Sequence, residues 1–414
     1  MAAERNRAGA RWMKILWVKV DFLHPTERGG QIRTLEMLRR LHRRHEVHYV
    51  GFTQPGLEEG PRRASEYSSY AYPIRHNVPP RRSLGFARQL AGSLFSPLPL
   101  SVSRYRSHEM ESKVRELLAQ HAFDSVVCDF VFPARNIPCM DRSVLFQHNV
   151  ETVIWRRHSQ NARYWAERAF FRMQAKRMFR YENAICHQAR RIVTVSETDS
   201  ETTRELFGLS KNVSAIPTGV DCEYFAAPAD LVPYRDLIFV GAMNWIPNID
   251  GMRFFIQNIW PRLRSAHPGC TLGIVGRAPT PEIRRLADAD SSIHVTGTVP
   301  DVRPYLWGSR VSVVPLRIGG GTRLKIYEAM AAGVPVVSTA VGAEGLPVRH
   351  PGEIRLADRP EDFAAECSRL LADEAGRRQL SAAARDWVIA NASWEAAVER
   401  FERILESAGS VNLD

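Results

Sequence analysis

The sequence contains no long hydrophobic run, and this absence argues against a membrane-spanning helix. Spanning a bilayer takes about 18 or more consecutive apolar residues, and no stretch of the 414 residues approaches that length. Residues 1–12 carry Glu4, Arg5, Arg7 and Arg11 without an apolar core, so they do not look like a secretory signal. We expect residues 1–12 to form a disordered extension and the protein to be cytoplasmic.

Cysteine is scarce, and acidic residues are outnumbered by basic ones. The six cysteines lie far apart, with no Cys-x-x-Cys pair and no histidine at zinc-finger spacing, so we expect buried thiols in a reducing compartment. The 56 Lys and Arg exceed the 45 Asp and Glu, which gives a net charge of +11 and a pI near 9.6. Such an excess attracts an anionic partner, and the candidates are nucleic acid, an acidic membrane leaflet and phosphorylated ligands.

Short apolar runs alternate with helical patterns along the whole chain. A length of 414 residues with 44% hydrophobic content suffices for two domains of about 150 to 200 residues each. Because strands separated by helices pair in parallel, we expect an α/β fold with two doubly wound parallel sheets. The expected strands are 14–20, 46–52, 124–130, 143–147, 190–195 and 213–216 in the first half, and 236–241, 271–276, 293–297, 311–316, 334–338 and 353–357 in the second.

Residues 319–339, GGGTRLKIYEAMAAGVPVVST, form the most informative stretch. Three glycines follow an apolar strand, so bare backbone can approach a ligand, and a helix is expected to begin at about Thr322. Its N-terminal amides favour an anion, and Arg323 and Lys325 add positive charge. Glu328 lies one to two turns into the helix, where it can accept hydrogen bonds from sugar hydroxyls. The stretch therefore predicts a phosphate-handling loop.

This stretch resembles the nucleotide-sugar site of family 4 glycosyltransferases, which are retaining enzymes with the GT-B fold. Four further segments match in order, namely Gly29-Gly30, residues 147–151 (QHNVE), residues 216–221 (IPTGVD) and residues 239–241 (FVG). The resemblance implies two facing Rossmann-like parallel-sheet domains with a cleft between them. It assigns residues 13–221 to an acceptor domain, 236–392 to a nucleotide-sugar donor domain, and 393–414 to a C-terminal helix that returns to the first domain, with a linker at 222–236.

The donor loops depart from the family pattern in two places. Residues 241–248, GAMNWIPN, lack the arginine and lysine that usually hold the diphosphate. Glu328 matches the second of the family's paired glutamates, but a glycine stands near the place of the first. Arg323 and Lys325 are therefore expected to hold the diphosphate, which leaves Glu328 for the ribose. The expected donor-binding residues are Gly241, Asn244, Gly320, Gly321, Thr322, Arg323, Lys325 and Glu328.

On the acceptor side, the resemblance singles out His148 as the catalytic residue. A histidine after the strand at 143–147 can hydrogen-bond a sugar hydroxyl or assist at the reacting carbon. Asn149 and Glu151 follow it in the same loop. Gly29 and Gly30, between a strand and a helix, can bring backbone amides to a phosphate or an acceptor hydroxyl, although a simple tight turn explains them as well.

The reaction implied by the resemblance is transfer of a sugar from a nucleoside-diphosphate sugar to a sugar or lipid-linked acceptor with retention at the anomeric carbon. Cations and helix-terminal amides would stabilise the departing diphosphate. No cofactor is expected, and since no Asp-x-Asp pair marks a metal site, the transfer is expected to be metal-independent. The nearest subgroup is the sugar transferases associated with bacterial exopolysaccharide biosynthesis.

Two basic segments rich in aromatic and aliphatic residues are candidates for contact with an anionic membrane surface. One segment runs from Trp155 to Arg180, and we expect it to form a helix. The other covers residues 80–106. Helices that pack their aromatics into the domain and leave the arginines in solvent are the alternative. If these segments contact a membrane, we expect the protein to lie on the inner face of the plasma membrane.

Two other functions fit parts of the sequence. A nucleotide-sugar epimerase of the same fold would share the donor motifs, but it needs acid and base residues around the sugar ring. A nucleic-acid-binding protein would explain the charge, yet no recognition-module signature is present, so nucleic acid is not expected as a partner.

Overall fold

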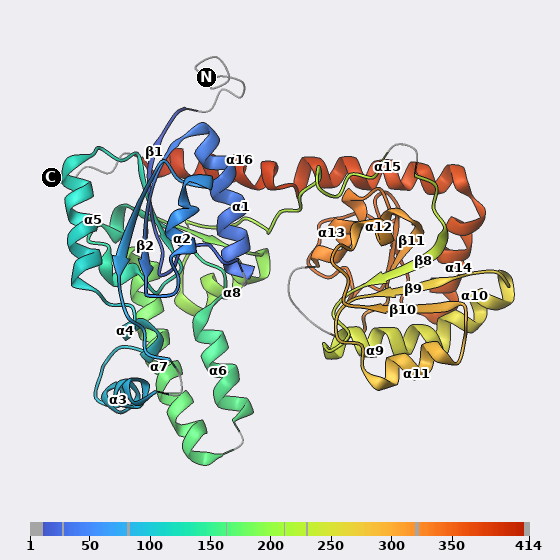
Figure 1. The fold of residues 1–414 in the computed structure, drawn as a ribbon, viewed down its shortest axis with the longest axis horizontal. Helices are drawn as coiled ribbons and strands as arrows, with labels where there is room; N and C mark the ends of the chain where they lie inside the picture. The colour runs from blue at the N-terminus through green and yellow to red at the C-terminus, as the bar shows by residue number, and fades with distance from the viewer. Residues whose placement is uncertain are drawn as a thin grey trace. The chain divides into compact units, whose positions relative to one another are not determined.

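The computed structural model describes residues 11–26, 29–80, 83–162, 164–210, 212–228, 231–318 and 323–409. The chain divides into two compact units (Figure 1). The first comprises residues 1–217 together with 397–414, and the second comprises residues 218–396.

The first unit is built on a seven-stranded sheet with the order β3-β2-β1-β4-β5-β6-β7. All its neighbouring strands pair in parallel, as the alternation of strands and helices predicted. The strands are β1 (Lys14–Val18), β2 (Glu46–Thr53), β3 (Tyr70–Arg75), β4 (Ser125–Asp129), β5 (Ser143–Phe146), β6 (Arg191–Thr194) and β7 (Val213–Ala215).

Strand β3 was not predicted from the sequence, because it lacks the apolar signature of the others. It lies at the edge of the sheet, contains Pro73, and has Ile74 as its one buried residue. Proline is tolerated at a sheet edge, where one side of the backbone needs no partner. An edge strand of this composition looks like a loop in the sequence.

Helices cover both faces of the first sheet (Figure 1). Helix α1 (Gly29–Arg44) buries Leu35, Leu38 and Leu41, whereas Ile32 is 45% exposed. The other helices of this unit are α2 (Glu59–Arg62), α3 (Leu84–Ser93), α4 (Leu100–Ser103), α5 (His108–Gln120), α6 (Glu151–Asn161), α7 (Trp165–Gln188), α8 (Glu197–Phe207) and, from Ala397 onward, α16 (Trp394–Ala408).

Helix α16 is attached to the first unit by both apolar and charged contacts. The Phe401 ring lies 5.8 Å from that of Trp17 and 5.2 Å from that of Phe146. Glu402 is buried and receives hydrogen bonds from Arg44 at 3.0 Å and from His45 at 3.1 Å. The C-terminal helix therefore completes the core of the unit formed by the first half of the sequence.

The second unit has a six-stranded parallel sheet with the order β10-β9-β8-β11-β12-β13. Its strands are β8 (Arg235–Val240), β9 (Leu272–Val275), β10 (Ile293–Gly297), β11 (Ser309–Val314), β12 (Val336–Ser338) and β13 (Arg355–Leu356). Its helices are α9 (Ile246–Phe254), α10 (Trp260–Ala266), α11 (Pro281–Asp288), α12 (Arg303–Trp307), α13 (Leu324–Ala331), α14 (Pro360–Ala372) and α15 (Glu374–Asn391), with a π-helical turn at Phe255–Ile259 between α9 and α10.

The chain enters the second unit at Gly219, where the absence of a side chain is required. A Cβ on Gly219 would lie 2.7 Å from the backbone of Trp394. Val220 pairs with Ser393 in an isolated parallel bridge. The TGVD turn is therefore a packing site against the start of α16.

Two expectations about helices need correction. The basic segment from Trp155 to Arg180 is not one helix, because the chain leaves the helical conformation at Ala162 (ψ 129°) and Tyr164 (ψ 146°), which separate α6 from α7. The helix of the phosphate-handling loop, expected to begin at about Thr322, begins at Leu324 within the described residues, and Arg323 occupies its N-cap position.

All six cysteines are buried free thiols, as their spacing predicted. Among the described helices, none is both long enough and apolar enough to cross a bilayer.

Candidate functional site

A buried carboxylate organises the carboxyl end of the first sheet. Asp129 is the last residue of β4 and is fully buried. Its Oδ1 accepts hydrogen bonds from Lys19 Nζ at 2.8 Å and His148 Nε2 at 2.7 Å, and its Oδ2 accepts from Trp17 Nε1 at 2.9 Å and Thr34 Oγ1 at 2.7 Å. Burial alone would raise the pKa of Asp129, but Lys19 and His148 hold that pKa well below its ordinary range. Asp129 is thus an anion that joins four segments of the unit.

His148 is the predicted catalytic residue, and its ring is deeply enclosed. It lies 5.2 Å from the ring of Phe130, in a stacked arrangement, and 5.2 Å from that of Phe146. Burial lowers the pKa of His148 to about 4, against the opposing effect of Asp129. The imidazole is therefore neutral at neutral pH, and its Nδ1 is buried without a hydrogen-bond partner among the described residues.

The first residues of α1 lie next to this histidine. A Cβ built on Gly30 would meet His148 Cγ at 3.5 Å and Nδ1 at 3.7 Å, whereas one on Gly29 would meet nothing within 4 Å. The structure therefore brings two of the sequence-predicted residues, Gly30 and His148, into one place. Gly29 stands beside them in open space.

Arg33, on α1, holds the backbone next to His148 in place. Its guanidinium is fully buried, donates to the carbonyl of Gln147 at 2.7 Å, and lies 4.1 Å from the centre of the Phe146 ring. It also donates to the carbonyls of Thr194 and Ile216, at 3.1 and 2.7 Å. These three carbonyls lie at the ends of β5, β6 and β7, so one side chain fixes the ends of three strands, including the residue before His148.

Two carboxylates meet at the start of α6. Glu182, on α7, accepts hydrogen bonds from the backbone amides of Glu151 and Thr152 at 3.1 and 2.8 Å, and from Gln147 Nε2 at 3.1 Å. It therefore caps α6 from a neighbouring helix. Burial, together with the charge of Glu182, raises the pKa of Glu151 to about 8, so Glu151 carries a proton at neutral pH. Asn149, also predicted in this loop, is exposed.

The second unit brings one predicted donor residue, Lys325, next to another, Gly241. Lys325 Nζ donates to Asn248 Oδ1 at 2.8 Å and lies 4.3 Å from the centre of the Phe239 ring. Asn248 also donates to the carbonyl of Ala242 at 2.9 Å. A Cβ on Gly241 would come within 2.9 Å of Lys325 Nζ, so the glycine is needed for the ammonium to lie there. The cation that the GAMNWIPN loop lacks in sequence is supplied in space by α13.

Lys325 and Glu328 are ionisable groups in an enclosed setting. Burial lowers the pKa of Lys325 to about 7 and holds the pKa of Glu328 above its ordinary value. Arg323 is buried, donates to the carbonyl of Val341 at 2.9 Å and approaches Glu344 at 3.7 Å. Lys325 is thus the predicted cation directed at the Gly241 loop, whereas these two contacts direct Arg323 toward residues 341–344.

Three predicted donor residues, Gly320, Gly321 and Thr322, lie outside the described residues. Asn244 is exposed on the Gly241 loop. Sequence reasoning missed Asn248, whose buried amide joins that loop to Lys325, and on the acceptor side it missed Lys19, Arg33 and Asp129. A polar residue directly after an apolar strand, as Asp129 is after residues 125–128, was the available signal.

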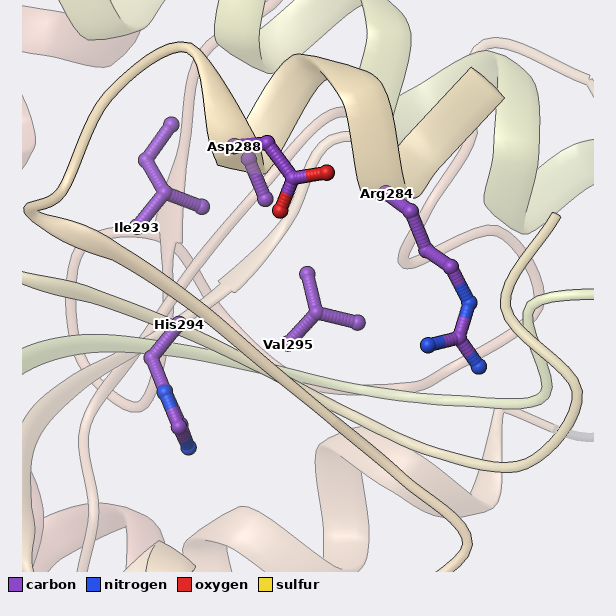
Figure 2. Close-up of a pocket in the computed structure, with 6 residues that line it drawn as sticks. Arg284, Asp288, Ile293, His294 and Val295 are labelled. Carbon is purple, nitrogen blue, oxygen red and sulfur yellow. The ribbon is translucent and has the colours of Figure 1, made fainter. Parts of the chain in front are cut away.

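A shallow pocket of about 230 Å³ elsewhere in the second unit includes none of the predicted site residues (Figure 2). It lies between α11 and the edge strand β10 and is lined by Arg284, Asp288 and His294, among others. Asp288 and Asp290 form an Asp-x-Asp sequence, but Asp290 accepts hydrogen bonds from Trp260 and Ser292. Within the described ranges, no group of three or more His, Cys, Asp or Glu is arranged to hold a metal ion.

Comparisons of the sequence with protein families give two matches. Residues 28–224 match the family described as Glycosyltransferase Family 4, and residues 234–373 match the one described as Glycosyl transferases group 1. The two matched segments cover the residues of both sites described above except Trp17 and Lys19, which precede residue 28.

Curated proteins similar to the chain are distant relatives. An uncharacterized 44.6 kDa protein in the cps region of Klebsiella pneumoniae is 22% identical over 385 residues, covering 89% of this chain and 93% of that protein. A GDP-mannose-dependent alpha-(1-6)-phosphatidylinositol monomannoside mannosyltransferase of Mycobacterium tuberculosis is 30% identical over 46% of this chain and 54% of its own length.

Solved structures resemble the whole chain in fold. HepE of Anabaena, in complex with UDP and glucose, has a TM-score of 0.61 at 13% identity and covers 95% of this chain and 100% of its own. Sucrose-phosphate synthase of Thermosynechococcus elongatus has a TM-score of 0.60 at 18% identity, with coverage of 95% and 98%. These similarities, together with the two parallel-sheet units, show the two-domain GT-B fold.

Proposed function

Because the chain belongs to glycosyltransferase family 4, we propose that it transfers a sugar from a nucleoside-diphosphate sugar to the hydroxyl of an acceptor with retention at the anomeric carbon. HepE of Anabaena, which is similar in fold, has been solved in complex with UDP and glucose and with UDP-glucose, and a similar mannosyltransferase is named as GDP-mannose-dependent. Those names support a nucleotide-sugar donor as the substrate class.

The observation that carries the proposal is the Lys325 ammonium beside the Gly241 loop. An enclosed ammonium with one side-chain hydrogen bond among the described residues, to Asn248, is suited to an anionic ligand, since the diphosphate adds to the negative charge that Glu328 supplies. As the bond to the sugar breaks, negative charge grows on the diphosphate, and a fixed cation stabilises it. Arg323 at the start of α13 adds a second positive charge, and Glu328 is left for the ribose. With two such cations, we propose that departure of the diphosphate needs no metal ion.

His148 acts at the acceptor in this proposal. A neutral imidazole held by Asp129 leaves Nδ1 as a hydrogen-bond acceptor. A sugar hydroxyl is the complementary donor. Gly30 lies beside the His148 ring, and Asn149 and Glu151 follow His148 in the chain; all three are proposed to contact the acceptor.

The acceptor is proposed to belong to polysaccharide or glycoconjugate synthesis, in line with the cps-region relative. A lipid-linked sugar fits an exposed surface of the first unit. Phe95 and Trp165 are 90% and 84% exposed, and Arg177 on α7 donates to the carbonyl of Leu94 at 2.8 Å, so the end of α3 and the α6–α7 pair are joined (Figure 1). We propose that this basic and aromatic surface contacts the cytoplasmic leaflet of the plasma membrane.

The membrane proposal is tested by sedimentation with anionic liposomes. Changing Arg156, Arg157 and Arg168 to Glu reverses three exposed charges on α6 and α7 and is expected to abolish binding, since each cation near the surface contributes about 1 kcal/mol. The matched control reverses Arg284, Arg285 and Arg378, three exposed arginines of the second unit. Equal loss in both variants would show that net charge alone is responsible.

The enzymatic proposal is tested by incubating the full chain with nucleotide sugars and candidate acceptors. Release of nucleoside diphosphate is expected only when an acceptor is present, and the product is expected to keep the anomeric configuration of the donor. Donor isomerisation without an acceptor would show an epimerase instead, and inversion at the anomeric carbon would refute retention. His148→Ala is expected to lower turnover strongly while donor binding stays unchanged.

A further inference from the structure

Lys19 and His148 share one oxygen of a buried carboxylate. Lys19 Nζ and His148 Nε2 lie 2.8 and 2.7 Å from Asp129 Oδ1. An ammonium donates only, and an anionic oxygen accepts only, so the histidine proton that meets Asp129 must be on Nε2. The other oxygen, Oδ2, already accepts hydrogen bonds from Trp17 and Thr34, so Lys19 and His148 cannot shift to it without displacing them.

We propose that Lys19 and Asp129 are positioning residues that hold His148 as a neutral imidazole protonated on Nε2, so that Nδ1 accepts a hydrogen bond from a hydroxyl of the sugar acceptor. The inference rests on the proposed function of His148. It adds two residues that no family match assigns and a defined protonation state.

The charge balance around the ring explains why the lysine matters. Three charged groups face His148, namely Asp129 from β4, Lys19 from the segment after β1, and Arg33 from α1. Asp129 alone would favour an imidazolium, because an opposite charge in contact stabilises the protonated ring. Lys19 compensates Asp129 directly at 2.8 Å, and Arg33 adds to the opposition. Because Asp129 is already paired with Lys19, burial has the larger effect on His148, and burial disfavours a second proton on the imidazole.

The geometry at Nδ1 points to a missing partner. Nδ1 is buried without a hydrogen bond among the described residues, and leaving a buried acceptor unpaired is unfavourable. Phe130, whose ring stacks on His148, has φ of 76°, a left-handed conformation that a bulky residue rarely adopts. Strain of this kind persists where it positions a functional group. Here it follows directly after Asp129 and fixes the ring plane.

The tautomer of the unmodified protein is the first test. The full chain is labelled with ¹⁵N in its imidazoles, and the His148 signals are identified by their loss in His148→Gln. Between pH 6 and 8 we expect a neutral ring with the proton on Nε2 and an unprotonated Nδ1. A proton on Nδ1, or a doubly protonated ring at pH 7, would overturn the proposal without any assay of activity.

Lys19→Met is the second test, and its control is Lys14→Met, at the start of the strand β1 that Lys19 follows. Lys14 pairs with Glu46 rather than with Asp129. Removing the Lys19 charge is expected to raise the pKa of His148 by about 1 to 3 units, and the Lys14 change is expected to leave it unmoved. An unchanged titration of His148 in Lys19→Met would refute the role of the lysine. If this variant does not fold, the tautomer of the unmodified chain still decides.

The pH dependence of transfer separates this inference from the proposed function. In Lys19→Met, the acid limb of kcat/KM for the acceptor is expected to move upward by the same interval as the pKa of His148. A full activity of His148→Gln would refute the proposed role of the histidine, even where the spectra show the expected tautomer. If the acid limb of kcat/KM does not move with the pKa of His148, the link between Lys19 and catalysis is refuted.

Discussion

The two units treat buried charge in opposite ways. In the first, Asp129 has four hydrogen-bond donors and Arg33 has three carbonyl acceptors, so the charges there are compensated. In the second, Lys325 has one hydrogen bond among the described residues, to Asn248. A compensated site holds a neutral group in a fixed direction, and an undercompensated cation is suited to an incoming anion. The contrast matches an acceptor hydroxyl in one unit and a diphosphate in the other.

Removing the anion of the compensated site is expected to have the largest effect. Asp129→Asn leaves the Lys19 ammonium buried without its partner, and breaking a buried pair in this way costs about 3 to 5 kcal/mol of unfolding free energy. Urea denaturation followed by tryptophan fluorescence measures the loss. Lys19→Met combined with Asp129→Asn is the control and is expected to recover part of it. A stable single variant would show that the charges are not as coupled as the distances imply.

Glu151 departs from this pattern of compensation in the first unit, and its titration tests that exception. The folded-state pKa near 8 lies above the unfolded value, so folding favours the protonated acid. Its ionisation therefore lowers stability as pH rises from about 4.5 to 8, by about 1.4 kcal/mol per unit of pKa displacement. Glu151→Gln is expected to raise the unfolding free energy at pH 8 by about 4 kcal/mol.

The gain from Glu151→Gln should vanish below about pH 4.5, where both states hold the proton. Parallel melting curves at pH 4.5 and pH 8 measure the difference. The same stabilisation at both values would show that Glu151 is ionised in the folded protein.

The undercompensated cation of the second unit is tested by ligand binding. Lys325→Met is expected to weaken a nucleoside diphosphate by about 1.5 to 3 kcal/mol, the contribution of a charge-assisted hydrogen bond, and to leave the nucleoside unaffected. Arg323→Ala is expected to show the same bias. Glu328→Ala is expected to weaken both ligands alike, as a ribose contact would. Calorimetric titration measures the affinity for each ligand. If the preference for the diphosphate survives in both cation variants, other residues hold the diphosphate.

A smaller effect distinguishes the two glycines of the first unit. Alanine at Gly30 places a methyl group in ordinary contact with His148, without a clash, and is expected to hinder an acceptor hydroxyl. Alanine at Gly29 meets nothing within 4 Å. We expect kcat/KM for the acceptor to fall about tenfold in Gly30→Ala, equivalent to about 1.4 kcal/mol, and less in Gly29→Ala. Equal kcat/KM values in Gly30→Ala and Gly29→Ala would show that Gly30 does not border the acceptor site.

Much of the fold was predictable from the sequence, because each buried strand is a short apolar run between helical patterns. The edge strand β3 was not, since half-exposed residues and Pro73 give no such run. The break between α6 and α7 was also missed, because the basic and aromatic composition continues across Ala162 and Tyr164.

The sites were predictable as motifs and not as contacts. Gly30 and His148 were both singled out, but their closeness follows from β1 and β5 ending at the same edge of one sheet. Lys325 and Asn248 meet although 77 positions separate them, and Lys19 and Asp129 meet across 110. Nothing local in the sequence marks either pair, because packing of distant elements creates both.

Proton uptake on donor binding tests the central claim most directly. With a pKa near 7, Lys325 is mostly uncharged at pH 8 in the free protein, and a bound diphosphate is expected to restore its charge. Calorimetric titration of UDP-glucose and GDP-mannose in buffers of different ionisation enthalpy counts the protons, because neither sugar diphosphate titrates near this pH. The account predicts uptake of about 0.9 proton at pH 8 for the donor that binds, and none in Lys325→Met. Donor binding without uptake, or equal uptake in the variant, would contradict it.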